Sequence, residues 1–150
     1  MNITKIDSIL VATDFSEQAR VATDWAVSLA ASLAARVVLA HVYALPIVGF
    51  PDGALLVDGA TAARLSDEAQ AALDAEIARV KGRGVSVEGV LREGDPREEI
   101  PALALSLGAG LVVAGSHGRR GIVRALLGSM ADSLVRTSRV PVVVVPHDAP

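Results

Sequence analysis

Short apolar runs alternate with longer amphipathic stretches along the whole chain. Most of the runs are almost purely apolar and no longer than six residues, which is typical of strands buried on both faces of a sheet. A further run, residues 85–91, begins with alternating apolar and polar residues, as an edge strand with one exposed face does. The predicted buried strands are residues 9–12, 37–42, 111–114 and 142–145.

Helical periodicity fills most of the intervals between these runs. A first helix is predicted over about residues 17–35, with Ser16 as its N-cap, because serine accepts a hydrogen bond from an unpaired N–H at a helix start. Further helices are predicted over about residues 62–83 and 129–137. The residues predicted to face the sheet are Ala19, Ala22, Ala26, Leu29 and Leu33 in the first, Leu65, Ala69, Ala72, Leu73, Ile77 and Val80 in the second, and Met130, Leu134 and Val135 in the last.

A third helix is predicted directly after the turn Gly94-Asp95-Pro96, with Asp95 as N-cap and Pro96 at its first position. Pro101 lies inside this helix, where proline removes a backbone hydrogen bond, so we expect a kink or a delayed helix start there. Residues 43–61 show no clear period and fit either a mobile lid or a long connection.

This order of strands and helices predicts a single α/β domain with a parallel sheet and right-handed crossovers. The last strand, residues 142–145, is expected at a sheet edge. Its unpaired main-chain groups there would invite a partner strand. We therefore predict a homodimer that forms through residues 142–145.

Composition narrows the possible functions. The chain is 51 % hydrophobic and 21 % charged, which is typical of a globular protein. A net charge of −3 and only 3 % aromatic residues argue against a surface that binds nucleic acid or anionic lipid. The chain has no cysteine, which excludes disulfides and thiolate chemistry. With no secretory leader and no apolar run of about 18 residues, we expect a cytoplasmic protein with no membrane contact.

Candidate chemistry concentrates in residues 115–129, GSHGRRGIVRALLGS, which directly follow a predicted buried strand. Gly115 and Gly118 have no Cβ, so a ligand can approach the main chain closely there. The Gly128-Ser129 pair opens a helix, whose free N–H groups and positive dipole end favour an anion. Arg119 and Arg120 lie between the two halves. The stretch therefore predicts a phosphate cradle, although a tight strand-to-helix turn is the alternative.

Two residues outside this stretch invite a functional reading. Asp14 lies at the carboxyl end of the first strand, where open α/β sheets bind ligands, but an aspartate before a helix is equally often a cap. His41, near the end of the second strand, is interpreted as a packed and hydrogen-bonded histidine rather than a catalytic one.

Several common active-site motifs are absent from the sequence: GxxxxGK[ST], GxGxxG after the first strand, GxSxG and HExxH. Ser116 and His117 are adjacent, so their side chains are expected to diverge rather than form a catalytic dyad. We therefore predict no catalytic residues and no metal ligands among the side chains.

The spacing Gly115-x2-Gly118-x9-Gly128-Ser129 resembles the nucleotide-binding signature of universal stress proteins. The resemblance extends over nearly the whole chain. Residues 11–16, 39–42, 94–96 and 138–146 resemble, in order, the family's opening strand and turn, its second strand end, its turn before the third helix and its closing strand.

This resemblance implies an open five-stranded parallel sheet with helices on both faces, a Rossmann-like fold of the adenine nucleotide alpha hydrolase-like type. ATP would lie where the first and fourth strands diverge, with Mg²⁺ or Mn²⁺ bound through its phosphates. Asp14 and the backbone of Ala12 and Val42 would hold adenine and ribose. The residues lining the ribose and phosphates would be Gly115, Ser116, His117, Gly118 and Arg119, and those binding the phosphates Gly128, Ser129 and Met130.

The function implied is an ATP-binding stress-response or signalling module with at most slow hydrolysis. An enzyme that transfers or hydrolyses phosphate with His117 or Asp14 stays open as an alternative. So does a dimerisation module that binds AMP, cyclic AMP or no nucleotide.

Overall fold

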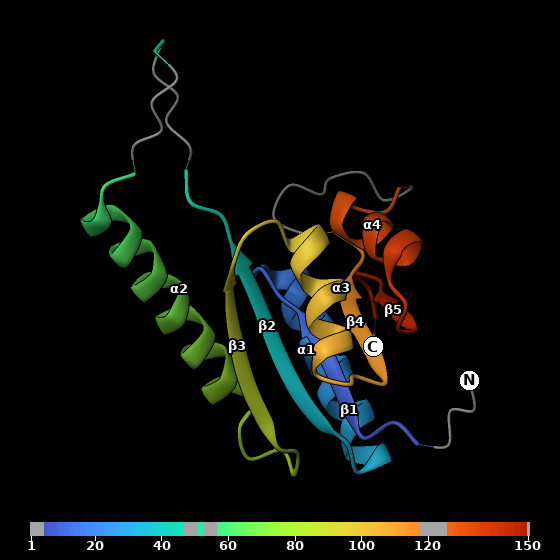
Figure 1. Cartoon of the computed structure of the whole chain (residues 1–150). Coiled ribbons are helices and arrows are strands. Elements are labelled where there is room, and N and C mark those ends of the chain that lie inside the picture. The colour runs from blue at the N-terminus through green and yellow to red at the C-terminus, as the bar shows by residue number, and fades with distance from the viewer. Residues whose placement is uncertain (1–4, 47–50, 53–56, 118–125, 150) are drawn as a thin grey trace.

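The computed structural model describes residues 5–46, 51–52, 57–117 and 126–149, and strands and helices alternate along them (Figure 1). The elements are β1 (Ser8–Ala12), α1 (Glu17–Leu33), β2 (Arg36–Tyr43), α2 (Gly59–Val80), β3 (Val87–Glu93), α3 (Pro96–Ser106), β4 (Leu111–Gly115), α4 (Ser129–Thr137) and β5 (Val142–Val145). The described residues contain no helix long and apolar enough to cross a membrane.

The strands form one five-stranded sheet in the order β3-β2-β1-β4-β5, with every neighbouring pair parallel. The predicted α/β fold with a parallel sheet is therefore confirmed, as are the edge positions of β3 and β5. Because β1 is central, the chain first builds the sheet outward through β2 and β3. It then crosses back to place β4 and β5 on the other side of β1.

Side-chain alternation along the strands produces two apolar cores, one on each face of the sheet. Ile9 and Val11 of β1 are fully buried in a cluster with α1 and α2. Leu10, between them, is fully buried in a second cluster with α3 and α4. In Figure 1, α1 lies behind the sheet and α3 in front of it. Helices thus cover both faces, as the resemblance implies.

Two residues predicted to face the core are exposed instead. Leu33 is 37 % exposed because the buried stripe of α1 consists mainly of alanines and ends at Ala30, one turn earlier. Val135 is 55 % exposed because α4 buries only Ala131 and Leu134, a stripe too narrow to include it.

Helix bounds also differ from the prediction. α2 starts at Gly59 rather than residue 62, because the Asp58 side chain caps it by accepting a hydrogen bond from the Thr61 N–H (2.7 Å). α3 begins at Pro96, so the delayed start near Pro101 is wrong, whereas a bend there stays a prediction. Of residues 43–61, for which a lid or a long connection was predicted, Tyr43 ends β2 and residues 59–61 begin α2, while residues 47–50 and 53–56 lie outside the described residues.

α2 buries an acidic side chain that its amphipathic pattern did not single out for the core. Glu76 is only 3 % exposed, and its carboxylate accepts hydrogen bonds from Arg79 Nε (3.0 Å) and Nη2 (2.7 Å). Arg79 also reaches Asp24 of α1 (2.8 Å), which ties the two helices together. Pairing and hydrogen bonding of this kind offset part of the desolvation penalty of a buried charge.

Ala34 ends α1 in the left-handed region, at φ 54° and ψ 37°, which disfavours any residue with a Cβ. We predict that Ala34→Gly raises the free energy of unfolding by about 0.5–1 kcal/mol, because glycine adopts this conformation without strain. Chemical denaturation measures the change. As a control, Ala75→Gly on the exposed side of α2 should lower the free energy of unfolding by about 1 kcal/mol. A destabilised Ala34→Gly variant would contradict the expectation.

Candidate functional site

The site lies at the carboxyl ends of β1 and β4, where the strand order reverses. β1 ends at Ala12 and β4 at Gly115, and the two strands are hydrogen-bonded neighbours. The chain leaves β1 for α1 on one face of the sheet and leaves β4 toward α4 on the other. Segments that depart to opposite faces leave a crevice between them, which is where open parallel sheets bind ligands.

The turn from β1 to α1 forms one wall of this crevice and is held by local hydrogen bonds. Thr13 N–H donates to the Ala40 carbonyl oxygen (2.9 Å), and Thr13 Oγ1 accepts from the Phe15 N–H (3.0 Å). Asp14 Oδ1 accepts from the Ser16 N–H (3.0 Å), and Ser16 caps α1 as predicted. Asp14 is therefore not the cap of α1. It shapes the turn before the cap, and it faces the crevice.

Phe15 closes this turn with a φ of 64°, a left-handed conformation that is unfavourable for a bulky side chain. Such a residue costs about 1–3 kcal/mol and persists only where its surroundings fix it. Its ring packs against the His41 ring, with the centroids 4.4 Å apart.

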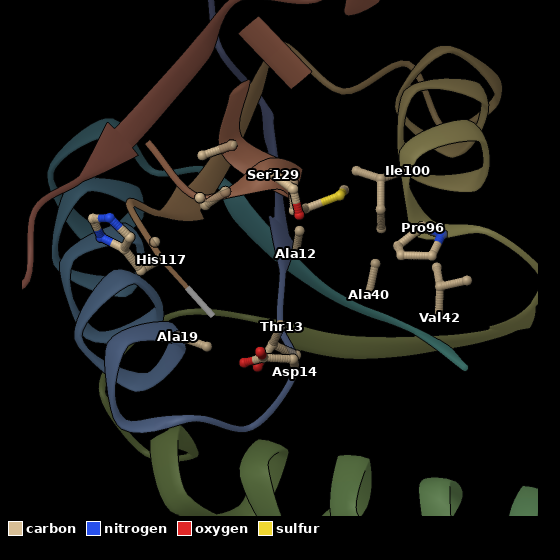
Figure 2. A pocket seen from close by; sticks show the side chains of 15 residues that line it. Ala12, Thr13, Asp14, Ala19, Ala40, Val42, Pro96, Ile100, His117 and Ser129 are labelled. Carbon is tan, nitrogen blue, oxygen red and sulfur yellow. The ribbon is translucent and has the colours of Figure 1, made fainter. Parts of the chain in front are cut away.

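A pocket of about 400 Å³ occupies the crevice (Figure 2). Small and apolar side chains from three neighbouring strands form its floor, and α3 supplies a further apolar wall. Polar groups lie along the rim that the β1–α1 turn and the start of α4 provide. The lining residues are Ala12, Thr13, Asp14, Ala19, Ala40, Val42, Pro96, Ile100, Ala114, Gly115, His117, Gly128, Ser129, Met130 and Ala131. An apolar slot beside a polar rim suits a ligand with a flat apolar part and a charged part.

Main-chain hydrogen bonds join the two halves of the predicted phosphate cradle. Ser116 N–H donates to the Val145 carbonyl oxygen (2.9 Å), and the Ser116 carbonyl oxygen accepts from the Gly128 N–H (2.7 Å). The end of β4 therefore holds the start of α4 in place. Gly118, Arg119 and Arg120 lie outside the described residues.

The missing Cβ of Gly115 has a use in the fold that was not predicted. A Cβ at this position would lie 3.1 Å from the Gln18 carbonyl oxygen and 3.3 Å from that of His117. The glycine therefore allows α1 to approach the end of β4, and Gly115 also lines the pocket.

The start of α4 presents main-chain donors to the pocket. Gly128 is the N-cap and has no side chain with which to satisfy the first N–H groups. The first N–H that bonds within the helix is that of Asp132, to the Gly128 carbonyl oxygen (2.9 Å). The preceding residues Ser129, Met130 and Ala131 line the pocket. Free N–H groups at the positive end of a helix dipole favour a bound anion.

Ser116 and His117 do not diverge as predicted. Ser116 Oγ lies 3.1 Å from His117 Nδ1, within hydrogen-bonding distance, because the main chain of Ser116 is fixed on both sides. His117 Nε2 is buried and has no hydrogen-bond partner among the described residues. The His117 ring lies across the pocket from Pro96 and Ile100 (Figure 2), whereas Ser116 is not one of the lining residues.

Most of the predicted site residues therefore come together around one pocket. Those that line it are Ala12, Asp14, Val42, Gly115, His117, Gly128, Ser129 and Met130. Ser116 lies beside the pocket, and its backbone holds Gly128. His41 is hydrogen-bonded to the Thr13 carbonyl oxygen (2.8 Å), so its interpretation as a packed histidine is confirmed.

The sequence reasoning missed the α3 wall and part of the floor. Ala40 and Ala114 could have been predicted to line the pocket from the sequence, because each is a small residue near the carboxyl end of an otherwise bulky apolar strand. Pro96 and Ile100 could not have been predicted in this way, since their place in the pocket depends on how α3 packs across the sheet.

A sequence model of the universal stress protein family matches residues 5–146. The chain is 27 % identical over 150 residues to universal stress protein MJ0577 of Methanocaldococcus jannaschii, with 91 % of this chain and 93 % of that protein covered. It is 32 % identical over 139 residues to universal stress protein MJ0531 of the same organism, with 91 % and 80 % covered.

Solved structures show the same likeness. The structure of MJ0577 superposes with a TM-score of 0.79 at 25 % identity, covering 95 % of this chain and 97 % of that one. A universal stress protein solved in complex with cAMP gives a TM-score of 0.71 at 26 % identity, covering 97 % of this chain and 100 % of that one.

The α3 wall generates a prediction about pH. Asp95 caps α3 and pairs with Arg97 (2.7 Å), and the hydrogen bond from the Arg97 side chain is the main reason that the pKa of Asp95 is lowered. A carboxylate with a lowered folded-state pKa stabilises the fold above its unfolded pKa of about 3.9, and this contribution is lost as the pH falls through the folded-state value. Asp95→Asn keeps a capping side chain but removes the charge. We therefore expect wild type to be more stable than this variant at pH 6, with the gap closing toward pH 2.

Denaturant titrations at a series of pH values measure this gap. In an Arg97→Gln background the pH dependence of the Asp95→Asn effect should be smaller, because the main cause of the lowered pKa is gone. A gap that stays constant from pH 6 to pH 2 would contradict the assignment.

Proposed function

The chain belongs to the universal stress protein family, and on that premise we propose that it binds an adenine nucleotide, ATP in particular, in the pocket between β1 and β4. The observation that carries the proposal is the uncapped start of α4, held by the end of β4 beside an apolar slot. One part of the pocket suits phosphate and the other suits a purine base.

The apolar slot is the proposed place for adenine. Ala12 and Ala40 form its floor, and Ile100 of α3 lies across from the start of α4 (Figure 2). Because alanine projects only a methyl group, these positions leave room for a flat ring. Asp14, at the rim, supplies a carboxylate that can accept hydrogen bonds from ribose hydroxyls.

The phosphates are proposed to lie at the start of α4. The N–H groups of Ser129 and Met130 and the Ser129 hydroxyl offer donors there. Gly118 and Arg119, outside the described residues, are proposed to complete the phosphate contacts. An arginine offsets phosphate charge in bidentate fashion. Mg²⁺ or Mn²⁺ would be held by the phosphate oxygens, since these hard cations prefer oxygen ligands.

We propose a binding and signalling role rather than turnover. The hydrogen bond between Ser116 and His117 is the described feature that most resembles a nucleophile and its base. However, Ser116 does not line the pocket, so its hydroxyl is not placed to attack a bound phosphate. His117 and Asp14 do line the pocket, but they are already hydrogen-bonded, to Ser116 Oγ and to the Ser16 N–H respectively. We therefore propose at most slow ATP hydrolysis and the role of a cytoplasmic stress-response module.

Calorimetric titration of nucleotide-free protein with ATP and Mg²⁺ tests the function, and Ser129→Asp tests the phosphate placement. An aspartate in the first turn of α4 suits the helix dipole, so stability should be unchanged or higher. Its charge should repel the phosphates and raise the Kd of ATP at least about tenfold. Adenosine, which has no phosphate, should bind the variant as it binds wild type.

Ser28→Asp, on the exposed side of α1, introduces the same charge away from the pocket and should bind ATP like wild type. Absence of any heat with wild-type protein would refute nucleotide binding. Equal weakening of ATP and adenosine by Ser129→Asp would refute the phosphate placement alone.

We also propose that two copies pair through β5. Val145 and Pro141 direct their carbonyl oxygens toward β4, where they accept from Ser116 and Val112 (both 2.9 Å). Since main-chain groups alternate sides along a strand, those of Val142 and Val144 point to the open edge of the sheet. A second β5 strand can pair with these groups.

Val144→Pro should therefore turn a dimer into a monomer. Proline removes the outward N–H of residue 144 but leaves the hydrogen bonds to β4 intact, and edge strands tolerate it. Val144→Thr, which keeps the N–H and a β-branched side chain, should stay dimeric. Sedimentation velocity separates the two states, and a wild-type monomer at tens of micromolar would contradict the proposal.

A further inference from the structure

His41 lies directly behind the pocket without lining it. Its neighbours in β2, Ala40 and Val42, face the pocket and pack in the cluster with α3 and α4. Because side chains alternate along a strand, His41 points to the opposite face of the sheet, as Leu39 does. There its ring packs against Phe15. Through this ring contact His41 touches the turn that forms one wall of the pocket.

The imidazole makes one direct polar contact with that turn. His41 Nδ1 lies 2.8 Å from the Thr13 carbonyl oxygen. A carbonyl oxygen only accepts hydrogen bonds, so Nδ1 must carry the proton and donate. The other main-chain group of Thr13, its N–H, donates to the Ala40 carbonyl oxygen (2.9 Å). β2 thus holds both main-chain groups of Thr13, one through its backbone and one through a side chain.

The conformation of the turn requires such support. Phe15 has a φ of 64°, which is unfavourable for a bulky side chain, and two hydrogen bonds inside the turn accompany it, from the Phe15 N–H to Thr13 Oγ1 and from the Ser16 N–H to Asp14 Oδ1. His41 supports it twice, by the hydrogen bond to Thr13 and by the ring contact with Phe15 at 4.4 Å. Asp14, which lies between these two supported residues, lines the pocket.

We propose that His41 is a positioning residue for nucleotide binding, which holds the 13–16 turn so that the Asp14 carboxylate faces the ligand. This inference rests on the proposed function. It assigns His41 no contact with the nucleotide.

The geometry specifies which substitutions should preserve the role. The side-chain amide nitrogen of asparagine can occupy the place of Nδ1 and donate to the Thr13 carbonyl oxygen. The amide of glutamine extends toward the place of Nε2 and cannot make the same bond. His41→Asn and His41→Gln are therefore a matched pair that differs in where the donor lies.

ATP binding by the two variants tests the inference. We expect His41→Gln to raise the Kd of ATP about tenfold, the effect of one lost hydrogen bond in a binding wall. His41→Asn should stay within about threefold of wild type. In an Asp14→Ala background, His41→Gln should change the Kd by less than about twofold, because the group that it positions is gone.

Amide hydrogen exchange provides a second readout that needs no nucleotide. The Phe15 and Ser16 N–H groups should exchange about tenfold faster in His41→Gln than in wild type, while the Val113 N–H in the central sheet is unchanged. General destabilisation would accelerate all three.

Equal binding by His41→Gln and wild type, or equal weakening by His41→Asn and His41→Gln, would overturn the inference. So would a full tenfold effect of His41→Gln in the Asp14→Ala background. If wild-type protein binds no adenine nucleotide, the proposed function fails, and the exchange rates alone decide whether His41 holds the turn.

Discussion

The pocket depends on one main-chain hydrogen bond, from the Gly128 N–H to the Ser116 carbonyl oxygen (2.7 Å). Ser116 follows β4 and is itself bonded to Val145 of β5. The bond therefore anchors the first turn of α4 to two strands of the sheet. Together with the buried Ala131 and Leu134, it fixes the direction of the free N–H groups of α4, and a helix dipole attracts an anion only within the first turn. The half of the pocket proposed to bind phosphate is thus positioned by the sheet.

Small side chains create the other half. Protein interiors are packed to about the density of organic crystals, so a hollow at the end of a sheet needs positions from which volume is missing. Ala12, Ala40 and Ala114 supply them, in strands that are otherwise built from valine, leucine and isoleucine. The low aromatic content has the same effect, because few side chains in this chain are large enough to fill the crevice.

Strands were predictable because burial on both faces leaves short, unbroken apolar runs, and the observed bounds of β1 and β5 match within one residue. The burial of single residues, and their place in the pocket, could not be predicted where they depend on neighbours far along the chain. Leu33 has the right spacing to be buried but lies beyond the alanine stripe that packs on the sheet. Ile100 enters the pocket only because α3 crosses the sheet near the end of β2, and no local pattern encodes that. Gly115 was recognised for its missing Cβ, yet the sequence did not show that α1 would use the space.

The two walls of the pocket are held by different kinds of interaction, and this difference has a consequence for specificity. The α4 wall is fixed by main-chain hydrogen bonds, which most substitutions leave intact. The 13–16 wall has one main-chain bond to β2, from the Thr13 N–H to the Ala40 carbonyl oxygen. It otherwise depends on the side chains of Thr13, Asp14, Ser16 and His41 together with the strained Phe15. A single substitution can move a wall of the second kind by the few tenths of an ångström that decide a hydrogen bond. Discrimination between ligands should therefore vary through the 13–16 turn, whereas the proposed phosphate site at the start of α4 should persist as long as the fold does.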